Sequence, residues 1–142
     1  MRKVVKFGGS SLASAEQFRK VGDIIRADES RRYVVPSAPG KRFSADTKVT
    51  DLLYQCYQAA EKGGAEFNAV LSEIKSRYQE IIDGLELSIS LEEDFGIIEE
   101  NFKKQIGEEY AASRGEFLNG KVMADYLGFE FVDAARIIRF DG

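Results

Sequence analysis

The sequence predicts an α/β fold: a three-layer α/β/α sandwich with a mainly parallel sheet and a helical insertion. Two short runs of β-forming residues, 4–7 and 32–35, are each followed by a loop and an amphipathic helical pattern. This alternation is typical of a parallel sheet whose faces are covered by helices. Between residues 64 and 106 only helical patterns remain, which indicates an insertion into the α/β unit.

The first strand leads into the first helix through a glycine turn. The run from Val4 to Phe7 ends in two glycines and two serines, as a buried strand before a tight turn would. Ser14 and Gln17 then have the spacing of a capping box, so a helix is expected to begin at Ser14. Apolar residues recur at helical spacing after this cap and predict the buried face of the helix: Phe18, Val21, Ile24 and Ile25.

The second strand, 32–35, is ended by the proline- and glycine-containing segment 36–40. Residues 41–48 are polar and are predicted to form a surface loop. Thr50 is placed as the N-cap of the next helix. One face of that helix is apolar and is predicted to enter the core, with the chain's one cysteine on it: Leu52, Leu53, Cys56, Tyr57 and Ala60.

Residues 64–106 are interpreted as a helical hairpin inserted into the α/β unit. A first apolar stripe extends from Phe67 to Ile82, and Ser90 with Glu93 is predicted to cap a second helix.

The remaining chain is predicted to return to the sheet. A helix is expected over 108–127, with Gly128 in its C-cap position. Two further strands are expected at 129–132 and 137–140.

The composition excludes several classes of site. The chain has 142 residues, no histidine and one cysteine, which excludes histidine-based catalysis and an intramolecular disulfide and argues against a structural zinc site. The net charge of −4, without clustered Lys or Arg, predicts no nucleic-acid partner and no membrane partner. No apolar run has the length of a transmembrane helix or the features of a signal peptide, so a cytoplasmic protein is predicted.

A candidate phosphate site lies at the end of the first strand. The glycines at 8 and 9 would let the backbone approach a phosphate, and the N–H groups at the start of a helix form an anion site. Lys6 on the strand could place its ammonium group on the same phosphates. The stretch is neither a Walker A loop nor a Rossmann fingerprint. The alternative is a tight β–α turn beside an exposed lysine, and the local sequence alone leaves both open.

Four stretches resemble motifs of the aspartokinases, within the amino acid kinase family, and occur in the order found in that family. KFGGSS at 6–11 is similar to the opening motif, and VVPSAPG at 34–40 to the second-strand motif V-V-S-A-x-G. TDLL at 50–53 is similar to T-[DN]-x-L, and SRGEFL at 113–118 to the S-x-G-E-x-L motif of the aspartate pocket. Because the four motifs extend over the whole chain, together they are far more specific than any one of them.

The resemblance implies an aspartate kinase, which transfers a phosphoryl group from ATP, with Mg²⁺, to the β-carboxylate of L-aspartate. The product would be 4-phospho-L-aspartate, the first step towards lysine, threonine and methionine. Residues 1–142 would form the N-terminal, substrate-binding lobe of the kinase domain, with the helical insertion at about 64–106. The nucleotide lobe and the regulatory ACT domains would lie outside this chain, which would be inactive alone. The full-length enzyme would be a homo-oligomer.

The same resemblance implies roles for individual residues. Lys6 would be the catalytic residue that neutralises charge on the transferred phosphoryl group. The residues that would hold the phosphates are Gly8, Gly9 and Ser10. The residues that would line the aspartate pocket are Ser37, Ala38, Thr50 and Glu116. Glu116 would pair with the α-ammonium group of the substrate, and no metal ligand is assigned. A histidine base is not needed, because the β-carboxylate is already ionised at neutral pH.

Plainer alternatives remain at this point. Each of these residues could have a structural role and no binding role. Ser37 could simply end a strand, Thr50 could simply cap a helix, and Glu116 could simply face solvent. Pro36 adds one residue before Ser37, and Asn119 stands where many members of the family have serine, so the contacts of Ser37 and Asn119 stay open. For the chain as a whole, the alternatives are another amino acid kinase, of the glutamate 5-kinase or uridylate kinase type, or a non-catalytic amino-acid-binding module.

Overall fold

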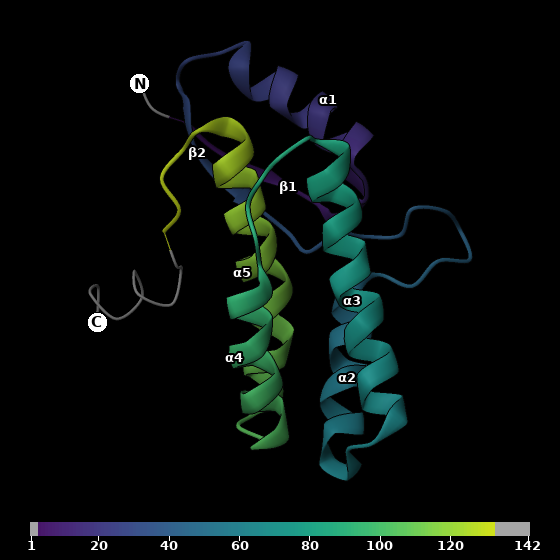
Figure 1. Cartoon of the computed structure of the whole chain (residues 1–142). Coiled ribbons are helices and arrows are strands. Elements are labelled where there is room, and N and C mark those ends of the chain that lie inside the picture. Colours follow the sequence, from purple (N-terminus) through teal and green to yellow (C-terminus); the bar gives the residue numbers. More distant parts are fainter. Residues whose placement is uncertain (1–2, 133–142) are drawn as a thin grey trace.

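The structure, a computed structural model, describes residues 3–132 (Figure 1). Its elements are, in order, β1 (Lys3–Phe7), the 3₁₀ helix η1 (Gly9–Leu12), α1 (Ala15–Arg26), β2 (Arg31–Pro36), α2 (Val49–Lys62), α3 (Ala65–Gly84), α4 (Glu92–Lys103) and α5 (Glu108–Leu127). This order confirms the α/β class, both predicted strands and the helical character of residues 64–106.

The two strands form a parallel sheet. Their register places Val4 beside Tyr33 and Phe7 beside Pro36. The ladder continues one residue further, because the Ser37 N–H donates to the Phe7 carbonyl at 3.0 Å. Pro36 therefore lengthens β2 by one residue without interrupting the pairing, and the loops that follow both strands leave from the same edge of the sheet.

The sheet has one covered and one open face among the described residues. Phe7 and Val34 are half-buried and pack against the helical core. On the other face, Val4, Tyr33 and Val35 are 60%, 51% and 46% exposed. Successive residues of a strand point to opposite faces, so Lys6 shares this open face. The helices between residues 15 and 127 thus supply a layer to one side of the predicted sandwich.

Helices α2 to α5 run alongside one another and extend away from the sheet (Figure 1). The core is a single cluster of buried side chains that reaches from Leu12 to Met123. Aromatic rings link the helices within it: Phe102 of α4 lies edge-on to Tyr57 of α2, with ring centroids 5.4 Å apart. The helices of the predicted insertion share this core with α2 and α5 and belong to the same bundle.

The cap of α1 is confirmed. The Ser14 hydroxyl accepts a hydrogen bond from the Gln17 N–H at 3.4 Å. We expect Ser14→Ala to lower the free energy of unfolding by about 1 kcal/mol, because this N–H loses its partner. Urea denaturation measures the change. Ser44→Ala is the control, since Ser44 is exposed in a loop, and an equal loss in both variants would contradict the capping role.

Two other caps differ from the prediction. Thr50 is not the N-cap of α2, which begins at Val49 with Lys48 in the cap position and no side-chain cap. Ser90 precedes the cap of α4, where Leu91 stands, although its hydroxyl accepts from the Glu92 N–H at 3.3 Å. Helix ends are defined only to within one or two residues. At the start of α2, the Val49 N–H donates to the Pro39 carbonyl at 3.0 Å, a contact with the loop after β2 that local sequence does not reveal.

The C-terminal predictions have mixed outcomes. Gly128 ends α5 in the left-handed conformation, with φ of 73°, as expected. The strand predicted at 129–132 is wrong, because these residues pair with neither β1 nor β2. Instead the Phe131 ring lies edge-on to Phe117 of α5, with centroids 5.6 Å apart. The strand predicted at 137–140 lies outside the described residues.

Burial tests the interpretation of the cysteine. Cys56 is fully buried, and burial raises the pKa of its thiol to about 12, so it is a core residue that stays protonated at neutral pH.

None of the helices between residues 3 and 132 combines the length and the apolar character that crossing a membrane would require.

Candidate active site

The glycine loop leaves β1 at the open end of the sheet. Gly8 is extended and exposed, and η1 begins at Gly9, with the Ser11 N–H donating to the Gly8 carbonyl at 3.2 Å. Leu12, which ends η1, is fully buried and anchors the loop in the core. A Cβ atom added at Gly8 would meet no atom within 4 Å. The backbone therefore faces open space where a phosphate could approach.

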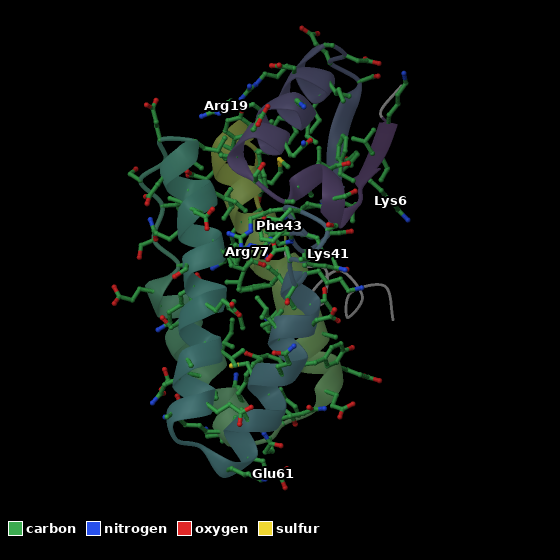
Figure 2. All side chains as sticks on the ribbon, turned by 90° about the vertical axis from the view of Figure 1, so that its right-hand side faces the viewer. Lys6, Arg19, Lys41, Phe43, Glu61 and Arg77 are labelled. Carbon is green, nitrogen blue, oxygen red and sulfur yellow. The ribbon has the colours of Figure 1, made fainter. Side chains whose placement is uncertain are left out.

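Lys6 stands at the end of β1, beside this loop. Its side chain is exposed and points away from the ribbon (Figure 2). Ser10 is also exposed. Within residues 3–132, no hydrogen bond or ion pair holds the Lys6 ammonium group. An exposed cation without a structural partner beside a glycine loop is available to bind an anion.

The loop after β2 lies directly against the glycine loop. The Gly40 N–H donates to the Gly9 carbonyl at 2.8 Å. A Cβ atom at Gly40 would lie 2.6 Å from the Gly9 carbonyl carbon, and one at Gly9 would lie 2.9 Å from the Ala38 carbonyl oxygen. Both positions must be glycine for the backbones to come this close. The parallel sheet thus brings together two loops that are about thirty residues apart.

Two side chains from the bundle hold the loop after β2 by its carbonyl groups. Asn119 of α5 donates from Nδ2 to the Ser37 carbonyl at 2.7 Å. Arg77 of α3 donates to the Gly40 carbonyl at 2.5 Å and to the Thr47 carbonyl at 2.8 Å. Asn119 is fully buried and Arg77 is 2% exposed. Tyr78, next to Arg77, donates to the Gly115 carbonyl of α5 at 2.8 Å.

The loop also has its own ion pairs. Asp46 binds Arg42 at 2.7 Å and lies 3.6 Å from Arg77. Hydrogen bonds from Arg42, helped by the Arg77 charge, hold the pKa of Asp46 well below its usual range. Burial and the nearby Arg42 charge lower the pKa of Arg77. The predicted surface loop 41–48 is therefore irregular but tied to the helices.

The residues proposed to bind L-aspartate lie in three neighbouring segments of the fold. Ser37 and Thr50 are half-buried, at the end of β2 and in the first turn of α2. Glu116 is exposed and follows Gly115, whose Cα is close enough to Ala38 that an added Cβ would lie 2.5 Å from the Ala38 Cβ. Because the Ala38 methyl group faces α5, Ala38 can offer only main-chain atoms to a ligand.

The residues that position these loops were not predicted from the sequence. Arg77 lies three residues after Ile74 on the apolar face of α3, and a charge in that stripe was the available signal. Tyr78 lies within the predicted apolar stripe from Phe67 to Ile82 and is buried, as expected, but its hydroxyl also donates to α5. The open question about Asn119 is answered by its bond to the Ser37 carbonyl.

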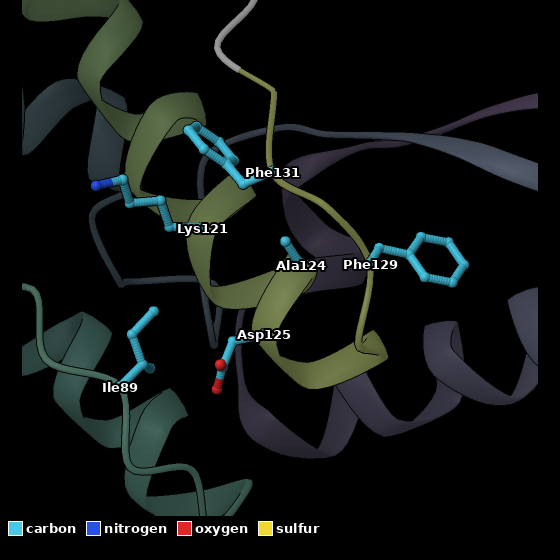
Figure 3. Close-up of a pocket in the computed structure, with 6 residues that line it drawn as sticks. All are labelled: Ile89, Lys121, Ala124, Asp125, Phe129 and Phe131. Atoms are coloured by element: carbon cyan, nitrogen blue, oxygen red, sulfur yellow. The ribbon is translucent and has the colours of Figure 1, made fainter.

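Two cavities lie away from these loops. One, of about 260 Å³, lies between α5 and the segments around it, lined by Ile89, Lys121, Ala124, Asp125, Phe129 and Phe131 (Figure 3). The other, of about 300 Å³, lies between α3 and α4. Over residues 3–132, no three acidic or cysteine side chains are grouped closely enough to hold a metal ion.

The chain is similar to aspartokinases in sequence and structure. It is 39% identical over 140 residues to Aspartokinase 3 of Bacillus subtilis (strain 168), covering 93% of this chain and 30% of that protein. It is 33% identical over 78 residues to the chloroplastic bifunctional aspartokinase/homoserine dehydrogenase 1 of Zea mays, covering 55% of this chain and 8% of that protein. The chain thus spans about 30%, or less, of the length of these relatives.

Solved structures of aspartate kinases also match this chain. The aspartate kinase of Clostridium acetobutylicum matches with a TM-score of 0.86 and 46% identity, covering 93% of this chain and 30% of that one. E. coli aspartokinase III, solved with aspartate and ADP, shares the fold with a TM-score of 0.68 at 24% identity, covering 90% of this chain and 29% of that one. The model of the amino acid kinase family matches residues 1–141. On this evidence, the chain belongs to the amino acid kinase family.

Proposed function

We propose that this chain is the substrate-binding part of an aspartate kinase. The reaction transfers the γ-phosphoryl group of ATP to a β-carboxylate oxygen of L-aspartate, which yields ADP and 4-phospho-L-aspartate. The observation that carries the proposal is the contact between the glycine loop and the loop after β2, with the Lys6 ammonium group, which has no partner among residues 3–132, beside it. The similarity to aspartokinases over 93% of the chain supports the choice of substrate.

The glycine loop has the role of holding phosphate. Gly8 and Gly9 supply backbone N–H groups, Ser10 adds a hydroxyl donor, and Lys6 stabilises the charge that develops on the transferred group. The nucleophile is the substrate's own β-carboxylate, which is ionised at neutral pH, so the protein mainly positions the two reactants. Mg²⁺ would arrive bound to ATP through phosphate oxygens, because the described residues offer no carboxylate cluster for it.

The loop after β2 and the middle of α5 have the role of binding L-aspartate. Ser37 and Thr50 offer hydroxyl groups, Ala38 offers main-chain atoms, and the Glu116 carboxylate pairs with the α-ammonium group of the substrate. Glu116 is exposed. An exposed ion pair is weak by itself. We therefore expect the aspartate site to gain strength when further protein covers it.

The extent of the enzyme is part of the proposal. The chain spans 30% of the length of Aspartokinase 3. We assign residues 1–142 to the substrate-binding lobe, with the helical insertion at about 64–106, and place a nucleotide lobe and ACT domains outside them. The isolated chain would then not turn over. The full enzyme would be a cytoplasmic homo-oligomer without a membrane or nucleic-acid partner.

Calorimetric titration with L-aspartate tests the proposal, with L-glutamate as the competing ligand. We expect selective binding of L-aspartate, and about threefold weaker binding in Glu116→Gln, because an exposed ion pair is lost. Glu61→Gln is the matched control, since Glu61 lies at the far end of the bundle (Figure 2). Preference for L-glutamate, or equal affinity in both variants, would contradict the assignment.

A chimaera covers the case in which the isolated chain binds neither amino acid. In it, this chain replaces the matching 30% of the Clostridium acetobutylicum enzyme. We expect the chimaera to form ADP in the presence of L-aspartate. Failure of a folded chimaera to do so would mean that this chain is not the substrate-binding part of an aspartate kinase.

A further inference from the structure

Two adjacent residues of α3 donate hydrogen bonds to two different parts of the candidate active site. Arg77 is 2% exposed and Tyr78 is fully buried. Arg77 donates to the loop after β2, and Tyr78 donates to α5, one residue before Glu116. Figure 2 shows Arg77 beside the loop that carries Lys41 and Phe43. One turn of the helical insertion therefore touches both parts of the proposed aspartate site.

Arg77 holds the loop at two separated points. Its guanidinium group donates to the carbonyl groups of Gly40 and Thr47, at 2.5 and 2.8 Å. The planar fork of an arginine can hold two acceptors in fixed directions, which a lysine cannot do. Gly40 in turn donates to the Gly9 carbonyl at 2.8 Å, so the same contact extends to the phosphate side.

Tyr78 of α3 holds α5 in position. Its hydroxyl donates to the Gly115 carbonyl at 2.8 Å. An added Cβ at Gly115 would lie 2.5 Å from the Ala38 Cβ, so α5 and the loop after β2 are packed too closely for any side chain at position 115. Glu116 follows directly. Its carboxylate position relative to Ser37 therefore depends on how α5 is seated against α3.

We infer that Arg77 and Tyr78 are positioning residues, through which the helical insertion sets the geometry of the L-aspartate site. The inference rests on the proposed function for the identity of the ligand. Burial of an arginine in an apolar bundle is costly, and an apolar side chain would fill the same space more cheaply. Its three contacts with the loop, the carbonyl groups of Gly40 and Thr47 and the Asp46 carboxylate, show where the charge acts.

Hydrogen–deuterium exchange on the chain as it stands tests the positioning itself. Arg77→Lys should speed exchange of the Gly40 and Val49 amides about tenfold, because both bonds depend on a fixed loop. Arg19→Lys is the matched control, since Arg19 also donates to a main-chain carbonyl, that of Gly84 at the C-terminal end of α3. Wild-type exchange over residues 37–49 in Arg77→Lys would overturn the inference.

Kinetics of the chimaeric enzyme test the effect on substrate. Tyr78→Phe should raise KM for L-aspartate about fivefold with KM for ATP unchanged, as expected for one lost hydrogen bond on the aspartate side. Tyr57→Phe is the control, because the Tyr57 hydroxyl accepts from the Gly107 N–H, away from the site. Arg77→Lys should raise both KM values, since Gly40 contacts the glycine loop.

The two failures are distinguishable. A folded chimaera that does not phosphorylate L-aspartate contradicts the proposed function, while the exchange experiment still reports on Arg77. An active chimaera in which Tyr78→Phe changes KM no more than Tyr57→Phe does contradicts the positioning role. A uniform fall in stability with unchanged KM values would also contradict it.

Discussion

Replacing Lys6 with methionine is expected to lower kcat of the chimaeric enzyme by about two to three orders of magnitude. Phosphoryl transfer depends on charge stabilisation of the transferred group, and Lys6 is the cation beside the glycine loop. The free energy of unfolding should change little, because the Lys6 side chain is exposed and has no partner among residues 3–132. Initial rates with saturating ATP and L-aspartate measure the first effect, and urea denaturation measures the second.

Lys3→Met is the matched control for Lys6. Lys3 lies on the same strand, but its ammonium group pairs with Asp28 at 2.9 Å. Loss of this exposed pair should affect stability by less than about 1 kcal/mol and leave kcat unchanged. Equal rates in Lys6→Met and the wild type would remove Lys6 from the mechanism, and the glycine loop would then be a structural turn beside an exposed lysine.

Replacing Gly40 with alanine is expected to lower the free energy of unfolding by about 3 kcal/mol and to abolish L-aspartate phosphorylation by the chimaeric enzyme. The added Cβ would lie 2.6 Å from the Gly9 carbonyl carbon and 2.8 Å from the Ser10 nitrogen. Both are main-chain atoms and cannot move aside as a side chain would. The loops must separate, which breaks the bond from the Gly40 N–H to the Gly9 carbonyl.

Gly96→Ala is the control for this steric argument. Gly96 lies within α4, and an added Cβ there would meet no atom within 4 Å. We expect this variant to gain about 0.5–1 kcal/mol, because alanine favours the helix over the unfolded chain. Urea denaturation of both variants gives the comparison. Wild-type stability in Gly40→Ala would show that the two loops can part without cost, and that their contact does not shape the site.

Local patterns in the sequence were enough to predict most of the fold. The alternation of strand, loop and helix predicted β1, α1, β2 and α2, and the spacing of Ser14 and Gln17 predicted the cap of α1. The glycine at 128 predicted the end of α5. These features depend on residues within a few positions of one another, so periodicity and capping chemistry reveal them. The motifs also marked the loops of the site.

Contacts between distant residues were decided by the tertiary structure. The strand predicted at 129–132 has no partner, because Phe131 packs on α5 instead. Thr50 is not a cap, because the Pro39 carbonyl receives the Val49 N–H. Arg77 reaches Gly40 across 37 positions of sequence. Sequence spacing describes one element at a time, whereas the partner of a buried donor or the room beside a glycine depends on how separate elements pack.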